Sequence, residues 1–175
     1  MRHLLVLGVA ALVTAFGGPR EGAVAAPARI SGFIQLPASG TGYYSYSPSS
    51  RRWGTPRMVY GILSCAKSWR VGHPSYPRLG VGDISLRYGG PISGHASHQK
   101  GVDVDVRPVR SWGEGTTAYG LSSYSRSRTA HLLTVHVKSH FNVRVIFFND
   151  PALYGPYSWI NYWPNHYNHF HLRIW

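Results

Sequence analysis

GHASHQKGVDVD, the stretch from Gly94 to Asp105, holds two histidines, two aspartates and two glycines in twelve residues. Valine and aspartate alternate strictly from 102 to 106. Successive side chains of a strand point to opposite faces, so the valines can face a core while Asp103 and Asp105 face a cleft. The pattern predicts a strand over 102–106, preceded by a histidine-bearing loop in which Gly101 allows a sharp turn.

A second group of histidines lies in NHYNHFH, from Asn165 to His171. Polar and apolar residues alternate again from 169 to 175, so His169, His171 and Arg173 share one face of a predicted strand. We expect the two histidine groups, far apart in the sequence, to meet over one metal ion.

The remaining patterns predict a single α+β domain. Helical spacing of Met58, Ile62, Cys65 and Trp69 predicts an amphipathic helix over 57–70, and a second helix is expected over 127–140. Further strands are expected over 33–36 and 143–148, and loops over 74–91 and 112–124.

Composition and the N-terminal residues indicate an exported globular protein. The chain is 43% hydrophobic and carries a net charge of +12, which suits a polyanionic partner. A basic start, an apolar run over 4–16 and a small-residue site at 23–25 are typical of a cleaved signal peptide. The apolar run is shorter than the roughly 20 residues of a membrane span. We therefore divide the chain into a signal peptide (1–25), an extended N-terminal segment (26–56) and a main domain (57–175) that contains both histidine groups. The single Cys65 excludes an intrachain disulfide.

The two histidine groups offer the ligands of a catalytic zinc site. His98 from the loop, Asp105 from the first strand and His171 from the last supply two imidazoles and one carboxylate, and leave a fourth position for water. Zinc would lower the pKa of that water and make it a nucleophile for amide hydrolysis. Each group alone could be an ordinary polar surface or turn, and only together do they favour a metal.

A zinc peptidase also needs a base. Glu114 lies in a loop without a fixed relation to the site, so His169 or His166 is the better candidate. Asp103 is expected to orient a ligand imidazole from behind. The remaining histidines of the mature chain outside the two groups are assigned no role and fit surface or helix positions; they are His73, His131, His136 and His140.

GHASHQKGVDVDV and NHYNHFHLRI, with the preceding VGDIS and GGP, resemble the penicillin-insensitive murein endopeptidase family. That family belongs to a wider group with lysostaphin-type enzymes, D-Ala-D-Ala peptidases and the hedgehog signalling domain. The resemblance implies a small antiparallel sheet flanked by helices, with long loops and one zinc ion on the sheet face. It implies the ligands His98, Asp105 and His171, and ties His169 and His166 to activity. His95 matches a histidine that faces a second metal position or the substrate.

The family cuts the D-alanyl to meso-diaminopimelyl cross-link of peptidoglycan and is insensitive to β-lactams. Asn168 departs from the family pattern, in which an acidic residue is common. We expect a monomer that reaches the periplasm or cell wall after signal-peptide cleavage near Ala25, and the resemblance implies peptidoglycan as its partner. A D,D- or L,D-carboxypeptidase and a non-catalytic zinc-containing wall-binding module remain alternatives. A nuclease is disfavoured, because phosphate chemistry usually recruits a cluster of carboxylates and this chain is poor in acid.

Overall fold

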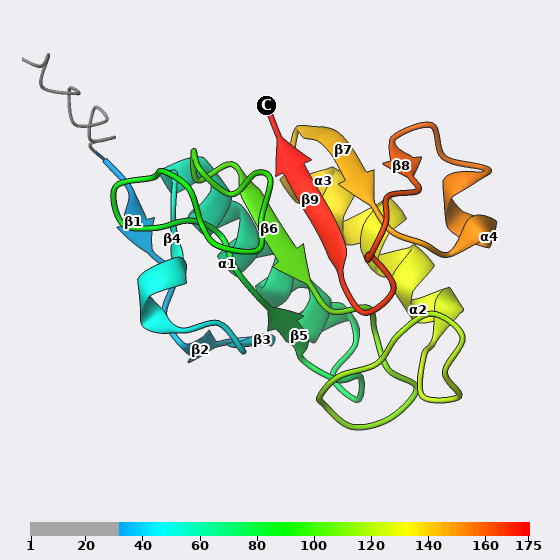
Figure 1. The fold of residues 1–175 in the computed structure, drawn as a ribbon. Coiled ribbons are helices and arrows are strands. Elements are labelled where there is room, and N and C mark those ends of the chain that lie inside the picture. Colours follow the sequence, from blue (N-terminus) through cyan, green and yellow to red (C-terminus); the bar gives the residue numbers. More distant parts are fainter. Residues whose placement is uncertain (1–31) are drawn as a thin grey trace, which may run out of the picture.

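The computed structural model describes residues 32–175, and the expected signal peptide lies outside the described residues. The described chain forms one α+β domain, which confirms the expected fold class (Figure 1). Within residues 32–175, every helix is too short or too polar to cross a bilayer.

A seven-stranded sheet forms the centre of the domain, in the order β2-β3-β5-β6-β9-β7-β8. Its strands are β2 (Ser39–Gly40), β3 (Tyr43–Ser45), β5 (Leu79–Val81), β6 (Asp103–Val106), β7 (Val143–Phe147), β8 (Ile160–Asn161) and β9 (Phe170–Ile174). The pairs β3–β5 and β7–β8 are parallel, and the other pairs are antiparallel. The sheet is therefore mainly antiparallel, as the family resemblance implied, and contains two parallel pairs.

The N-terminal segment contributes directly to this sheet. Strands β2 and β3 form one edge of it, and β1 (Ile34–Gln35) pairs separately with β4 (Trp53–Gly54). A short 3-10 turn, η1 (Ser49–Arg51), lies between them. A loop was predicted over 74–91, and this prediction was wrong at β5. Its three residues are all buried, and two flanking strands pair with it.

The first helix, α1 (Pro56–Gly72), begins and ends within two residues of the predicted bounds. Thr55 caps its N-terminus by accepting a hydrogen bond from the main-chain N–H of Met58 at 3.2 Å, and Pro56 needs no such partner. The predicted apolar stripe is buried and includes Trp69, which is fully buried. This stripe anchors α1 to the sheet.

The second helix has three parts. The α-helical turns α2 (Arg126–His131) and α3 (Lys138–His140) enclose a π-helical segment, η2 (Leu132–Val137). Figure 1 shows α1 and the α2–α3 helix behind the sheet, and a fourth short helix, α4 (Pro151–Tyr154), beyond β8. The valines and leucines of β6 and β9 pack toward the helices, with Val104 and Leu172 at most 1% exposed. The opposite face of these two strands is free to carry polar side chains.

Candidate metal centre and active site

The pairing of β6 with β9 brings the aspartates and the C-terminal histidine together. Asp105 lies opposite His171 in the antiparallel register, and Asp103 lies opposite Arg173. Directly opposed residues have their Cβ atoms about 4.5–5.5 Å apart on the same face. The alternation seen in each strand therefore places four polar side chains on one patch of the sheet.

The loop before β6 adds His98 to this patch. His98 has a φ of +63°, and Gly101 follows with a φ of +65°. A Cβ at Gly101 would lie 2.9 Å from the Cα of Gly54, so only glycine fits where the loop passes the N-terminal segment. The main-chain N–H of His98 also donates to Oδ2 of Asp103 at 3.3 Å. These constraints turn the His98 ring into the site, where it is 1% exposed.

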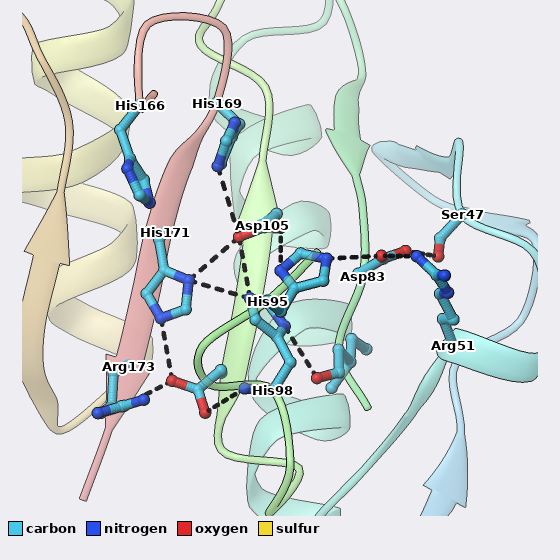
Figure 2. Close-up of polar contacts among 12 residues, drawn as sticks. Ser47, Arg51, Asp83, His95, His98, Asp105, His166, His169, His171 and Arg173 are labelled. Carbon is cyan, nitrogen blue, oxygen red and sulfur yellow. Dashed lines mark hydrogen bonds and ion pairs between the residues drawn. The ribbon is translucent and has the colours of Figure 1, made fainter. Parts of the chain in front are cut away.

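Three side chains from three segments converge on one point (Figure 2). Nε2 of His98 lies 3.0 Å from Nδ1 of His171, and Oδ1 of Asp105 lies 3.2 Å from each of these nitrogens. All three residues are buried. The three atoms form a nearly equilateral triangle.

The hydrogen bonds behind the triangle decide which ring nitrogens carry a hydrogen. Nδ1 of His98 lies 3.0 Å from the main-chain oxygen of Ile84, and Nε2 of His171 lies 3.0 Å from Oδ1 of Asp103. A carbonyl oxygen and an ionised carboxylate only accept, so both nitrogens donate. The other nitrogen of each neutral ring then presents a lone pair, and both lone pairs face Asp105.

The charges on the two aspartates follow from the same contacts. Burial raises the pKa of Asp103, but hydrogen bonds from His171 and Arg173 outweigh burial and lower the pKa to about 2. Burial also opposes ionisation of Asp105, and the contacts with His171 and His98 again outweigh it, so its pKa lies far below the usual range. Both carboxyls are ionised at neutral pH.

Three electron-pair donors at 3.0–3.2 Å repel one another unless a proton or a metal cation lies among them. The pKa of His171 reflects this demand: burial lowers it, but the two aspartates outweigh burial and raise it above the ordinary value. Tetrahedral zinc, with ligand bonds of about 2.0–2.2 Å, separates its ligand atoms by roughly 3.3–3.6 Å. The triangle is close to that size. Its two imidazoles and one carboxylate fit zinc, and they would also suit other late transition metals.

His95 lies beside the triangle, and a contact with an aspartate fixes its ring, as Asp103 fixes the ring of His171. Its Nε2 lies 2.9 Å from Oδ2 of Asp83, and its Nδ1 lies 3.8 Å from Oδ2 of Asp105. Asp83 also accepts from Ser47 Oγ and, at 2.9 Å, from Arg51 Nη1. Burial raises the pKa of Asp83, and these three hydrogen bonds outweigh it and lower the pKa. His95, His98 and Asp105 thus form a second set of possible ligand atoms, all within 4.8 Å of one another.

No role was predicted for Asp83, Ser47 or Arg51. Ser47 and Arg51 come from a segment without periodicity, and only the folded sheet brings that segment to the site. Two signals for Asp83 were available: it is one of five acidic residues after position 25, and it lies within the VGDIS segment that resembles the family.

His169 and His166 lie at the rim of the site. Nε2 of His169 is 3.9 Å from Oδ1 of Asp105, and its Nδ1 is 2.8 Å from Oδ1 of Asn168. Nδ1 of His166 lies 2.8 Å from the main-chain oxygen of Pro164, and the two imidazole rings are 4.7 Å apart. Both Nδ1 atoms face acceptors, so both Nε2 atoms are available as proton acceptors. Burial lowers the pKa of His169 to about 4, with Asp105 opposing the shift, and burial also lowers the pKa of His166.

The site opens into a cleft with two adjoining hollows, which share His95, Asp105 and His169. One has a volume of about 420 Å³, and its other walls include Phe147, Trp163, His166 and Arg173. The second has a volume of about 220 Å³, and its other walls include Tyr46, Asp83, Arg107 and Asn168. The cleft therefore extends to both sides of Asp105.

A buried triad of two imidazoles and a carboxylate, on the sheet face of a small α+β domain and open to a cleft, offers a ligand set that could hold a metal ion. The model of the penicillin-insensitive murein endopeptidase family matches residues 22–145, well over half of the chain. The chain belongs to this family. The match includes the loop of His98 and strand β6, and it ends within β7.

Two curated relatives carry the same description. The penicillin-insensitive murein endopeptidase of Klebsiella pneumoniae is 37% identical over 79 residues, which are 44% of this chain and 28% of that protein. The enzyme of that description from Haemophilus influenzae is 35% identical over 79 residues, which are 44% of this chain and 27% of that protein. The aligned part spans little more than a quarter of each relative.

Proposed function

We propose that the chain is a zinc-dependent endopeptidase that hydrolyses the peptide cross-links of peptidoglycan. The observation that carries the proposal is the triangle of Nε2 of His98, Nδ1 of His171 and Oδ1 of Asp105, which lie 3.0–3.2 Å apart in residues that line a cleft. Membership of the murein endopeptidase family supports peptidoglycan as the substrate. We propose the D-alanyl to meso-diaminopimelyl bond as the point of cleavage, and we expect β-lactams not to inhibit the enzyme, because its mechanism acylates no serine.

His98, Asp105 and His171 would hold the zinc ion. When bound there, zinc supplies a Lewis acid that lowers the pKa of water and polarises the scissile carbonyl. Asp103 and the carbonyl of Ile84 keep both imidazoles in the tautomer that presents a lone pair to the ion. These partners also prevent the rings from rotating when substrate enters.

His169 is the proposed general base. It remains neutral at physiological pH because burial lowers its pKa, and its Nε2 lies at the edge of the triangle. From there it can accept a proton from the attacking water and deliver it to the leaving nitrogen. Asn168 fixes the ring through a neutral amide, so it orients His169 without adding the negative charge of the acidic residue common in the family. His166 is the alternative base.

The shape of the cleft favours an endopeptidase over a carboxypeptidase. An endopeptidase must accommodate peptide on both sides of the scissile bond, and hollows lie on both sides of Asp105. Arg173 lines one hollow and Arg107 the other, and both offer charge to the carboxylates of a stem peptide. Export by way of the proposed signal peptide would bring the enzyme to the wall, and the basic charge of the chain, +12 over all 175 residues, favours an anionic polymer. We propose that it acts there as a monomer and not on nucleic acid.

Digestion of purified cross-linked muropeptides, with and without a chelator, tests the function. Mass analysis should show dimers converted to monomers only when metal is present. Loss of terminal D-alanine without dimer cleavage would instead identify a carboxypeptidase. A zinc-loaded chain without turnover would identify a wall-binding module, and both outcomes contradict the proposal.

Two substitutions separate the proposed roles. His171→Ala should lose the metal, because it removes one of three ligands. His169→Ala should keep the metal and lose roughly 10²–10⁴-fold in rate, the usual contribution of a general base. If His166→Ala costs more rate than His169→Ala at full metal content, His166 is the base.

A further inference from the structure

A second group of histidines lies on the helical layer, away from the cleft. His73 follows the last residue of α1, His131 ends α2, and His136 belongs to η2. One nitrogen from each of the three rings lies within 4.8 Å of the other two. The ring centroids are 4.9–5.5 Å apart.

The π-helical turn is what brings two of these rings together. In an α-helix, residues five apart point in directions that differ by about 140°. A π turn, with hydrogen bonds from residue i to i+5, stacks such residues one above the other. The main-chain N–H of Lys138 bonds to the oxygen of Leu133, five residues back. His131 and His136, also five apart, therefore face the same side and meet His73 at the end of α1.

Packing holds the buried member in place. His136 is 7% exposed and packs edge-on against Trp69, with ring centroids 5.3 Å apart. Its Nδ1 lies 3.2 Å from Ser68 Oγ. Within residues 32–175, its Nε2 makes no hydrogen bond, so this nitrogen is available to a ligand. His73 is fixed by stacking on Tyr76 at 4.7 Å.

The pKa shifts of His73 and His136 favour the neutral form of both imidazoles. Burial lowers the pKa of His73, and the nearby His131 and Arg128 lower it further. Burial likewise lowers the pKa of His136, and the neighbouring histidines add to this effect. The Arg128 guanidinium lies over the Tyr76 ring at 4.0 Å, and its Nη1 donates to the main-chain oxygens of Arg110 and Ser111. Neutral imidazoles offer lone pairs, and lone pairs on nitrogen bind late first-row metals.

We propose that His73, His131 and His136 form a second metal site, independent of the cleft, for a late first-row divalent cation such as Zn²⁺, Cu²⁺ or Ni²⁺. The site joins the end of α1 to the π turn of the neighbouring helix. His131 is partly exposed and can rotate, so the nitrogens can approach from 4.8 Å to the roughly 3.3 Å spacing of a tetrahedral ion. Water completes the coordination. An ion bound there stabilises the folded chain in proportion to its concentration.

Metal counting on the full chain, without a histidine tag, tests this site. After equilibrium dialysis against Zn²⁺, the unmodified chain should hold one equivalent more than His131→Gln. The substitution should weaken this site by more than about 100-fold, because loss of a partner behind a ligand alone costs about 10–100-fold. His140→Gln is the matched control, since His140 lies on the same helix but outside the group, and it should keep the full count.

Zinc-dependent melting gives the second readout. Added Zn²⁺ should raise the melting temperature of the unmodified chain more than that of His131→Gln or of His73→Gln. Equal zinc counts and equal shifts for the unmodified chain and His131→Gln would overturn the proposal and leave the histidines as packing residues. A loss of one equivalent in His140→Gln would overturn it as well, because it would indicate unspecific binding. The result does not depend on metal in the cleft. If the cleft binds none, the unmodified chain should hold one zinc ion and His131→Gln none, so the difference of one equivalent remains.

Discussion

Replacing Asp103 with asparagine tests the part of the site that lies behind the proposed ligands. Asp103 is 2% exposed, and its oxygens accept hydrogen bonds from His98, His171 and Arg173. In Asp103→Asn, an amide NH₂ group replaces one of these oxygens. It cannot accept a hydrogen bond, so at least one of the three donors loses its partner. The carboxyl pKa is lowered from 3.8 to about 2 in the folded chain. At about 1.4 kcal/mol per pKa unit, the charge contributes about 2 kcal/mol to the free energy of unfolding.

The pH dependence of this contribution has a definite sign. Because the folded pKa lies below the unfolded one, the contribution is complete above the unfolded value of 3.8 and is lost as pH falls toward about 2. The unfolding free energy of the unmodified chain should therefore fall more steeply over this window than that of Asp103→Asn. Above pH 5 the two curves should run parallel.

Urea unfolding of the chelator-treated chain at pH 7 measures the difference. Asp103→Asn should lower the unfolding free energy by about 2 kcal/mol, and metal affinity in a separate titration should fall about 10–100-fold. Glu114→Gln is the matched control, since Glu114 pairs with Arg78 where both side chains are 38% exposed. Such exposed pairs contribute about 0–1 kcal/mol. Equal losses for both variants, or an unchanged metal affinity in Asp103→Asn, would refute the role assigned to Asp103.

Three further predictions concern the fold. Gly101→Ala should destabilise the chain more than Gly94→Ala in urea unfolding. Both glycines have positive φ, but the new Cβ would lie 2.7–2.9 Å from neighbouring atoms at 101 and would meet no described atom within 4 Å at 94. Equal losses of unfolding free energy would show that backbone strain alone acts. Cys65 should resist thiol reagents at pH 8 until urea is added, because burial raises its pKa to about 12; rapid labelling of the folded chain would contradict this. Tyr124→Phe should cost about 1–3 kcal/mol, since it removes the 2.7 Å hydrogen bond to the fully buried Asp150, and an unchanged melting temperature would disprove it.

Elements with a clear period could be predicted from the sequence. The apolar stripe of α1 and the alternation of β6 and β9 are local properties, and their observed bounds differ from the predicted ones by two residues at most. The proximity of His98, Asp105 and His171 followed from the same patterns, because each motif lies on a strand or directly before one. The distances of 3.0–3.2 Å agree with that expectation.

Other features have no local signal. Strands β3 and β5 have three residues each and pair in parallel, so neither is long enough to show a period. A π turn differs from an α turn by one residue, and the apolar pattern of 127–140 tolerates either. The meeting of Asp83 with His95 depends on how the N-terminal segment wraps the sheet. The contacts that were missed are those set by tertiary packing.

The position of β9 in the sheet has a consequence for folding kinetics. β9 lies between β6 and β7, and the contact between Asp105 and His171 closes a loop of 66 residues. Chains dominated by such distant contacts fold slowly, because the entropy of the loop is lost before the contacts form. Insertion of β9 completes the proposed ligand triangle and the hydrophobic core together, so a partly folded chain has no complete set of the proposed ligands. Tight metal binding should therefore appear at the same rate as the slowest folding phase, so that the rate of metal binding during refolding measures that phase.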